Sequence, residues 1–424
     1  MLCFFLLLVA ALVINCASSH EKQQPFNTDQ NDNVLLNILK KYPQKFSKVL
    51  SDSTEYDMQI IYTQIDRDKN NKPSYHTFTY GLDKKKYFYP ASLVKLPCSA
   101  MAMEKLNELN IKGLDKFSRM QTDSAWKCQK RILEDTTAEN KIPSVANYIK
   151  RMMLVSDNDA YSRIYEFLGQ QYINKRMHDM SYSNAYIIHR FDAECNNEAN
   201  KYTNPVSFYD SEGKLLYSQP MQHNEEIYKH PLDSVKKGKA YLNGANKLVK
   251  QPKDFTYSNF LTLQEIDNIL KAVIFPQSVP EKQRFHIKEE DRQFLLRYMS
   301  MYPRESDHPH YDMKKFEDSY KKYFMYATWH KKIEQDTMRI FNVVGQSYGY
   351  LADCAYIYDF KNNVEFMLTA VLYVNSDGII NDGKYDYANI GFPFLSDLGN
   401  VIHDYELSRR REFKPDLKEF RLKY

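Results

Sequence analysis

The sequence predicts a mixed α/β fold of the α+β type, in which an antiparallel sheet is flanked by helices and an all-helical subdomain is inserted between its strands. Two observations support this expectation. Apolar and polar residues alternate in short runs within 55–80, which indicates strands, and strand patterns return within 338–375. The sequence between these segments is mainly helical in pattern, with the inserted subdomain at about 91–334. We therefore expect the two ends of the chain to pair in one sheet.

The N-terminal residues 1–17 are typical of a signal segment. Cys3 to Ile14 form a continuous apolar run of twelve residues, which is too short to span a bilayer. The residues around Cys16 favour a bacterial lipoprotein signal, in which this cysteine is lipidated and begins the mature chain. The alternative is cleavage after Ala17 or Ser18, which would release a soluble protein. Either ending predicts an extracytoplasmic location.

The mature chain is expected to be one domain, 33–424, behind a polar tether at 18–32. A final amphipathic helix is predicted at 393–409. Hydrophobic residues make up 43% and aromatic residues 14% of the chain, which is enough for a large core. The net charge of +4 comes from mixed charges along the chain, so we expect no nucleic-acid partner.

The cysteines of the mature body favour disulfides over a zinc ribbon, because no C-x-x-C pair occurs. One or two disulfides are expected in an oxidising compartment, with the pairing left open. Besides Cys16, the cysteines are Cys98, Cys128, Cys195 and Cys354. A metal site at His308, His310 and Asp312 lacks support, since these residues lie on a proline-broken segment. No metal ion and no cofactor are expected.

A serine and a lysine stand three residues apart where an apolar helix is predicted to begin. Ser92 and Lys95 would share one face of that helix, so the amine would lie beside the hydroxyl. A serine hydroxyl needs such a base to act as a nucleophile, and a helix N-terminus favours developing negative charge. This spacing alone is also common in ordinary surface pairs, so its meaning depends on the segments that follow.

Three later segments complete the pattern. Ser156-Asp157-Asn158 is a tripeptide that would set a hydroxyl and an amide against the serine–lysine pair. Residues 190–196 read R-F-D-A-E-C-N, and residues 343–345 read V-V-G at the start of a predicted strand pair.

In this order the four segments resemble the class A β-lactamases, which belong to the penicillin-recognising serine hydrolases with the β-lactamase/transpeptidase-like fold. The family reads S-x-x-K, then S-D-N, then R-W-E-P-E-L-N on a loop and K-T-G on a strand. The similarity covers most of 33–409 and is interrupted by an enlarged region, 206–342. The C-terminal residues are similar to one bacterial branch of the family.

The resemblance implies an acyl-enzyme mechanism. Ser92 would attack an acyl carbonyl, and Lys95 would take or relay its proton. Ser156 would pass a proton to the leaving nitrogen, while Asn158 would help to hold Lys95 and the substrate amide. The backbone N–H groups of Ser92 and Gln346 would form the oxyanion hole.

The loop departs from the family at the base that removes the acyl group. Asp192 stands where the family has glutamate, and with Asn196 it would hold the hydrolytic water. Glu194 is the alternative base. A purely structural interpretation, in which Asp192 pairs with Arg190, is also open. Because aspartate is one methylene shorter, deacylation is expected to be slow if the water is misplaced.

The predicted strand lacks the lysine that the family has at this position. Val343 and Val344 stand where lysine and threonine are expected to bind a substrate carboxylate, and only Gly345 is retained. Losing one charge-assisted hydrogen bond costs about 1.5–3 kcal/mol. The sequence does not identify a replacement cation.

Three functions remain open from the sequence. The resemblance favours hydrolysis of β-lactam amides, which implies β-lactam catabolism and antibiotic resistance. The second is a D,D-peptidase on cell-wall peptide, or an esterase, with the same acyl-serine step. The third is a catalytically weakened binding protein. The expected partner is a small-molecule β-lactam or a cell-wall peptide, and the expected state is a monomer in the periplasm, or anchored in the outer membrane through a lipidated Cys16.

Overall fold

The computed structural model describes residues 33–192 and 195–424. The predicted signal segment 1–17 with Cys16, the tether 18–32 and Glu194 lie outside the described residues.

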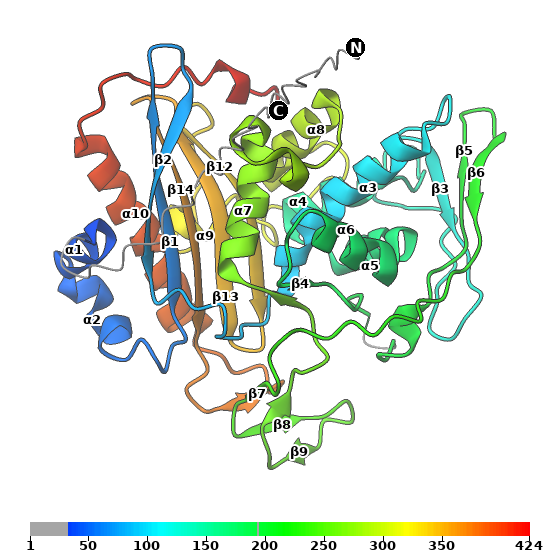
Figure 1. Ribbon diagram of the computed structural model, residues 1–424, viewed down its shortest axis with the longest axis horizontal. Coiled ribbons are helices and arrows are strands. Elements are labelled where there is room, and N and C mark those ends of the chain that lie inside the picture. The colour runs from blue at the N-terminus through cyan, green and yellow to red at the C-terminus, as the bar shows by residue number, and fades with distance from the viewer. Residues whose placement is uncertain (1–32, 193–194) are drawn as a thin grey trace, which may run out of the picture.

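A five-stranded antiparallel sheet joins the two ends of the chain in the strand order β12-β13-β14-β1-β2 (Figure 1). The first two strands precede the inserted region and the other three follow it, as predicted from the alternating patterns. The bounds are β1 (Gln59–Arg67), β2 (Pro73–Tyr80), β12 (Met338–Ser347), β13 (Tyr350–Asp359) and β14 (Val364–Tyr373). The predicted fold class is thereby confirmed.

The hairpin between β12 and β13 fixes the register of the strand that carries V-V-G. Its two-residue turn is Tyr348-Gly349, and both residues have positive φ, as a tight hairpin turn requires. The register places Val344 opposite Asp353 and Gly345 opposite Ala352.

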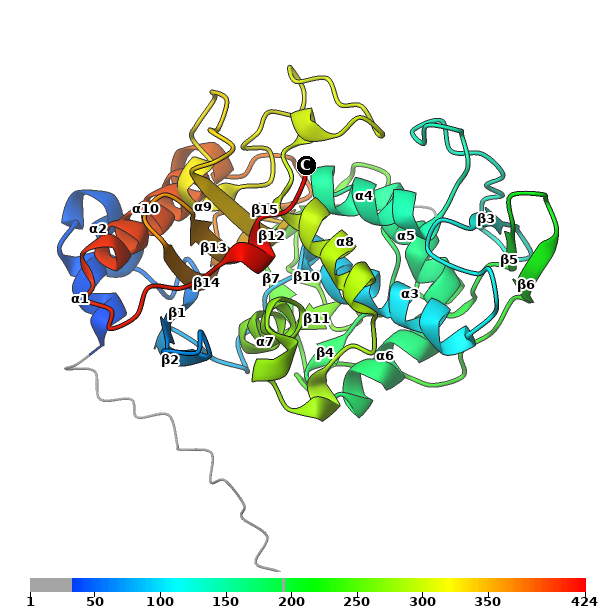
Figure 2. The same ribbon diagram turned by 90° about the horizontal axis from the view of Figure 1, so that it is seen from above.

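Three helices cover one face of the sheet. They are α1 (Val34–Lys40), α2 (Pro43–Ser51) and α10 (Phe392–Ser408), and Figure 2 shows them on one side of the strands. Their apolar residues share a core with that face of the sheet. Helix α10 lies where the final amphipathic helix was predicted.

The inserted region covers the other face and extends away from it (Figure 2). Helix α3 runs through its middle and is buried on most sides, as a helix without a polar face must be. Its helices are α3 (Lys95–Leu109), α4 (Val145–Val155), α5 (Asn158–Leu168), α6 (Gln170–Asp179), α7 (Leu263–Ile274), α8 (Glu289–Ser300) and the single turn α9 (Tyr323–Tyr326). None of the helices in the described ranges is both long and apolar enough to cross a membrane.

Short strands correct the expectation that the inserted region is all-helical. A three-stranded sheet at its far end consists of β3 (Arg119–Thr122), β5 (Val206–Tyr209) and β6 (Leu215–Gln219) (Figure 1). In β5 buried and half-buried residues alternate over only four positions, which is too short a run to be distinguished by its period. Two-stranded and three-stranded ribbons add β4 (Ala185–Tyr186), β7 (Lys236–Lys237), β8 (Ala240–Leu242), β9 (Leu248–Val249), β10 (Lys253–Asp254), β11 (Phe260–Leu261) and β15 (Ile379–Ile380).

Single helical turns connect these elements. The 3₁₀ turns are η2 (Ala91–Val94), η3 (Ala199–Lys201), η4 (Pro276–Ser278), η5 (Glu281–Gln283), η6 (Pro303–Glu305) and η8 (Lys418–Phe420), and η7 (Tyr387–Gly391) is a π turn.

The structure also settles the cysteine pairing. Cys128 and Cys195 form a disulfide, whereas Cys98 and Cys354 are free thiols buried in the core. Burial raises the pKa of both thiols, so they behave as small apolar side chains.

Candidate active site

Ser92 lies in the 3₁₀ turn η2, directly before helix α3. The turn begins at Ala91, whose φ of +46° is a strained value for an alanine. The helix begins at Lys95, so Pro97 falls in its first turn, where a proline is tolerated. This geometry brings the Lys95 Nζ to 2.8 Å from the Ser92 Oγ.

Lys95 is the central group of the site and is completely buried. Its Nζ also lies 3.0 Å from the Ser156 Oγ and 2.7 Å from the Asn158 Oδ1, and it donates to the Ser156 carbonyl. Burial lowers the pKa of Lys95 well below its usual range, the charge of Lys321 lowers it further, and Asp157 opposes these effects. The neutral amine is therefore favoured.

A neutral Lys95 amine is well arranged to accept a proton. It has two N–H donors and one lone pair, and the carbonyl oxygens of Ser156 and Asn158 can only accept hydrogen bonds. When the two N–H groups donate to these oxygens, the lone pair is left for a hydroxyl proton. The Ser92 hydroxyl is within reach of it.

The Ser156-Asp157-Asn158 tripeptide forms the turn between α4 and α5. Ser156 ends α4 in a left-handed conformation, with φ of +57°. Asp157 caps α5 by accepting from the Ala160 N–H at 2.9 Å, and Asn158 is the first helical residue. The same aspartate is held by Arg151 at 3.0 Å. These caps aim the Ser156 and Asn158 side chains at Lys95.

Ser92 lies where two cavities meet. The first has a volume of about 480 Å³ and the second about 510 Å³, and Ser92, Asn158 and Gln346 line both. The first is also lined by Val155, Ser156, Ser319, Tyr320, Lys321, Tyr323, Ala327, Val344 and Phe392. The second is rich in aromatic side chains, including Tyr89, Phe191 and Tyr348, and it includes His189 and Lys253.

Strand β12 forms one wall of the first cavity. It approaches η2 so closely that a Cβ on Gly345 would lie 2.6 Å from the Pro90 carbonyl oxygen, so this position requires glycine. The Gln346 Oε1 accepts a hydrogen bond from the Tyr323 hydroxyl at 3.1 Å. Val344 lines the cavity, whereas Val343 is 1% exposed and lies in the core.

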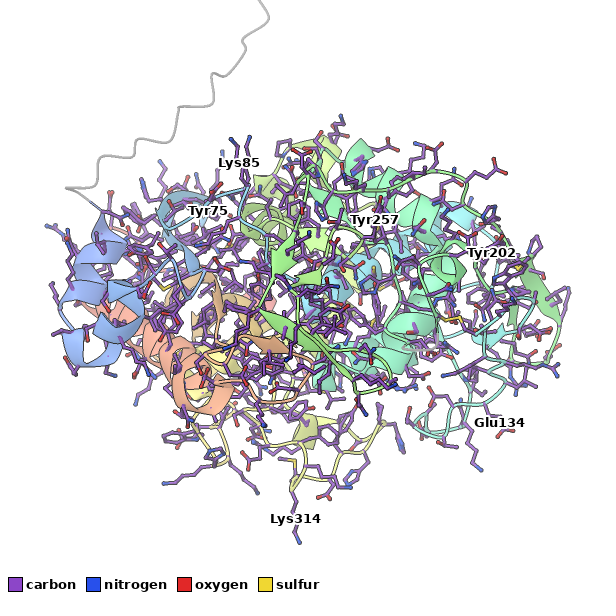
Figure 3. All side chains as sticks on the ribbon, turned by 90° about the horizontal axis from the view of Figure 1, so that it is seen from below. Tyr75, Lys85, Glu134, Tyr202, Tyr257 and Lys314 are labelled. Carbon is purple, nitrogen blue, oxygen red and sulfur yellow. A yellow bond between two sulfur atoms is a disulfide. The ribbon has the colours of Figure 1, made fainter. Side chains whose placement is uncertain are left out.

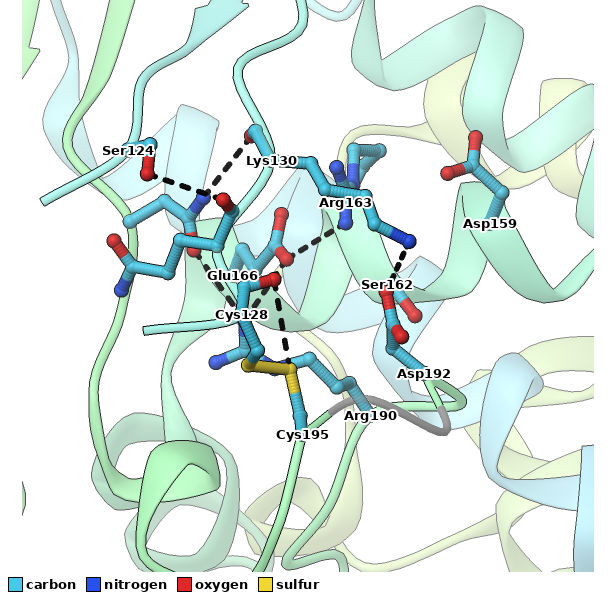
Figure 4. A network of polar contacts seen from close by, with 12 residues as sticks. Ser124, Cys128, Lys130, Asp159, Ser162, Arg163, Glu166, Arg190, Asp192 and Cys195 are labelled. Atoms are coloured by element: carbon cyan, nitrogen blue, oxygen red, sulfur yellow. Dashed lines mark hydrogen bonds and ion pairs between the residues drawn. A yellow bond between two sulfur atoms is a disulfide. The ribbon is translucent and has the colours of Figure 1, made fainter. Parts of the chain in front are cut away.

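The loop that follows β4 forms a wall of the second cavity, and its polar contacts differ from expectation (Figure 4). Asp192 lines this cavity, and its Oδ2 lies 2.8 Å from the Lys130 Nζ. Arg190 pairs with the buried Glu166 at 2.9 Å, and these two contacts take the place of the pair of Asp192 with Arg190 that the sequence left open as an alternative.

Asn196 is not among the residues that line the two cavities, although its neighbours Cys195 and Asn197 line the second. It is exposed, and its Oδ1 accepts from the N–H of Ala199, the first residue of η3, at 2.9 Å. The adjacent disulfide between Cys128 and Cys195 ties this loop to the segment that carries Lys130 (Figure 4). A cation and a disulfide therefore hold Asp192 and its loop in place.

Sequence reasoning missed Lys321, the one charged residue among the described residues that line the first cavity. Its Nζ donates to the Met153 carbonyl at 2.5 Å and to the Met152 carbonyl at 3.3 Å. Burial lowers its pKa to about 7, against the opposing attraction of Asp353. The residue lies between helical and strand elements in the enlarged region, so no periodic pattern marks it.

One group of side chains within the described ranges is close enough together to hold a metal ion. It consists of Glu104, Glu108 and His286. Glu104 is already engaged by Arg176 through two hydrogen bonds of 2.6 and 2.9 Å. This group lines neither cavity beside Ser92.

Comparisons with known proteins give one family and a set of distant structural relatives. Residues 42–223 match the model described as the beta-lactamase enzyme family. No curated protein matches the chain.

Three similar solved structures are distant in sequence. The beta-lactamase from Sphaerobacter thermophilus is 9% identical, with 89% of this chain and 98% of that chain covered and a TM-score of 0.45. The class A beta-lactamase from Clostridium kluyveri is 12% identical, with coverage of 86% and 98% and a TM-score of 0.45. An acyl-enzyme complex of a PBP-A mutant with penicillin G is 12% identical, with coverage of 88% and 96% and a TM-score of 0.45.

Proposed function

Because residues 42–223 match the beta-lactamase enzyme family, we propose that this chain is a serine hydrolase that forms an acyl-enzyme on Ser92. One observation carries the proposal. The buried Lys95 amine lies within hydrogen-bond distance of the hydroxyls of Ser92 and Ser156 and of the Asn158 amide oxygen. This arrangement supplies a nucleophile with an adjacent base and a second hydroxyl for proton transfer.

The reaction follows from these contacts. The Ser92 Oγ attacks the substrate carbonyl carbon while its proton moves to the Lys95 Nζ. The backbone N–H groups of Ser92 and Gln346 stabilise the oxyanion, and the close approach of β12 to η2 at Gly345 supports this placement. Ser156 then passes a proton from Lys95 to the leaving nitrogen, and the C–N bond breaks. The acyl group remains bound to the Ser92 Oγ.

The proposed substrates are β-lactam amides, with a cell-wall peptide or an ester as the alternative acyl donor. The acyl side chain of the substrate would occupy the aromatic second cavity, and the leaving part would extend into the first. Asp192 lines the second cavity, which supports a role in holding the hydrolytic water. The Asn196 Oδ1 accepts from the Ala199 N–H, so we assign this residue no direct role.

One observation favours a second candidate, a protein that is acylated and deacylates slowly. The Asp192 Oδ2 is engaged by the Lys130 ammonium at 2.8 Å, so a hydrolytic water would have to compete with this ion pair for the carboxylate. The two candidates share the acylation step and differ only in the lifetime of the acyl-enzyme.

The cellular setting is also part of the proposal. We infer an extracytoplasmic protein of the periplasm, anchored in the outer membrane through a lipidated Cys16 and acting as a monomer. The apolar run before Cys16 supports this inference.

The test is intact-protein mass spectrometry after mixing with a chromogenic cephalosporin and a fluorescent penicillin. We expect a covalent adduct that is absent in Ser92→Ala and present in Ser207→Ala, a matched variant on the distant strand β5. A long-lived adduct supports slow deacylation, and a transient adduct with turnover supports hydrolysis. The absence of any adduct in the wild-type protein would refute the proposal.

A further inference from the structure

The first cavity beside Ser92 is lined by a positive charge and by no negative charge among its described residues. Its described lining residues include Ser156, Ser319 and Tyr320, which offer hydroxyl groups, and Lys321, which is its only charged residue. No aspartate or glutamate is among them. A cavity with a cation and several hydroxyl groups suits an anionic ligand group.

Lys321 is a buried lysine whose hydrogen bonds go to carbonyl groups. It is 3% exposed, and within the described part of the chain its Nζ donates to the Met152 and Met153 carbonyls and to no carboxylate. Asp353, the acid that influences its pKa, is occupied by the Asn342 amide and by the backbone N–H groups of Tyr323 and Phe324. Burying an unpaired ammonium is costly, so a bound anion would stabilise it.

The neighbouring lysine shows what a structural role looks like in the same segment. The Lys322 Nζ donates to the Met299 and Ile340 carbonyls and to the Asn342 Oδ1, at 2.6 to 2.8 Å. All three ammonium donors are therefore satisfied, and Lys322 does not line the cavity. Lys321 has two acceptors, at Met152 and Met153, which leaves one donor for a ligand.

The position of Lys321 links it to the reacting groups. Its two acceptor carbonyls are in the last turn of α4, the helix that ends at Ser156. Its charge lowers the pKa of Lys95, so the two amines are electrostatically coupled. Lys321 belongs to a long connection that reaches the surface, where Lys314 projects at the edge of the molecule (Figure 3).

We propose that Lys321 is the cation that binds a substrate carboxylate in this cavity and thereby selects acyl substrates with a carboxylate on the Ser156 side of the reacting carbonyl. It would supply the charge that Val343 and Val344 lack on β12. This inference rests on the proposed function, because it assumes that the reacting acyl group is bound at Ser92.

The test uses binding without acylation, in the Ser92→Ala protein. The two probes are a cephalosporin with a free carboxylate and its methyl ester, and calorimetry at pH 6.5 gives both dissociation constants. We expect the carboxylate to bind about 10- to 100-fold more tightly than the ester, which is the range of one charge-assisted hydrogen bond. Adding Lys321→Met should reduce this ratio to about 1, and Lys321→Arg should keep most of it.

Two controls separate specificity from stability. Lys322→Met removes an equally buried lysine that does not line the cavity, so it should keep the carboxylate preference. Lys321→Gln is a neutral variant that can still donate to the Met153 carbonyl, and it serves if the methionine variant does not fold. A carboxylate preference that survives in a neutral Lys321 variant, or that is absent in Ser92→Ala, would overturn the inference.

The acylation experiment on the wild-type protein distinguishes the two proposals. A missing adduct with an intact carboxylate preference refutes the acyl-enzyme on Ser92 and keeps the role of Lys321. An adduct without a carboxylate preference refutes the role of Lys321 alone.

Discussion

Replacing Lys321 by methionine should change how the stability of the protein depends on pH. In the folded protein burial lowers the pKa of Lys321 to about 7, whereas an unfolded lysine titrates near its ordinary value of about 10.4. Between these values the unfolded chain binds one proton more than the folded chain. The free energy of unfolding therefore rises with pH in this window, and it is lower below pH 7, where the folded protein must bury a charged amine.

The size of the effect follows from the same shift. One extra proton in the unfolded state gives a slope of about 1.4 kcal/mol per pH unit. From pH 8 to pH 9.5 this single lysine contributes an increase of about 2 kcal/mol. Lys321→Met removes this contribution, while Lys95 and Lys322, whose pKa values are also lowered by burial, remain in both proteins.

Denaturant unfolding at pH 8 and pH 9.5 measures the effect as a difference between the two proteins. The wild-type protein should gain about 2 kcal/mol more than Lys321→Met over this interval, whatever their absolute stabilities. The same difference is expected in the presence of salt, because the main cause is burial and not a screened surface charge. Equal changes in the two proteins would show that Lys321 is not a desolvated amine, and the electrostatic reasoning about the first cavity would be wrong.

Three further predictions concern the base, the loop and the strand beside the nucleophile. Lys95→Met should slow acylation about 10²- to 10⁴-fold in stopped-flow measurements, and the wild-type rate should rise with pH as its amine loses a proton. Cys128→Ser opens a disulfide that closes a loop of 67 residues, so calorimetry should show that the free energy of unfolding falls by about 4 kcal/mol. When both proteins are reduced, their free energies of unfolding should be equal. Gly345→Ala places a Cβ 2.6 Å from the Pro90 carbonyl oxygen and should cost about 1–3 kcal/mol in denaturant unfolding, whereas Gly244→Ala, which meets no atom within 4 Å, should be neutral.

The fold and the positions of Ser92, Lys95 and Asn158 could be predicted because they depend on the spacing of residues that are close in the sequence. The three-residue spacing of Ser92 and Lys95 brings both to the junction of η2 and α3, and Asp157 marks the helix start that orients Asn158. The strand patterns in 338–375 identify strands that are buried on both faces. The strands of the inserted region were not predicted because they are too short to show the two-residue alternation of a strand.

The sequence by itself determined an α+β fold with a sheet from both chain ends, and a serine, a lysine and an amide at the start of two helices. Only the tertiary structure decided that Asp192 pairs with Lys130, that Cys128 bonds to Cys195, and that Lys321 lines the cavity beside Ser92. The physical reason is distance along the chain. Lys321 meets Met153 across 168 residues, and such a contact depends on how whole elements pack, which no local spacing encodes.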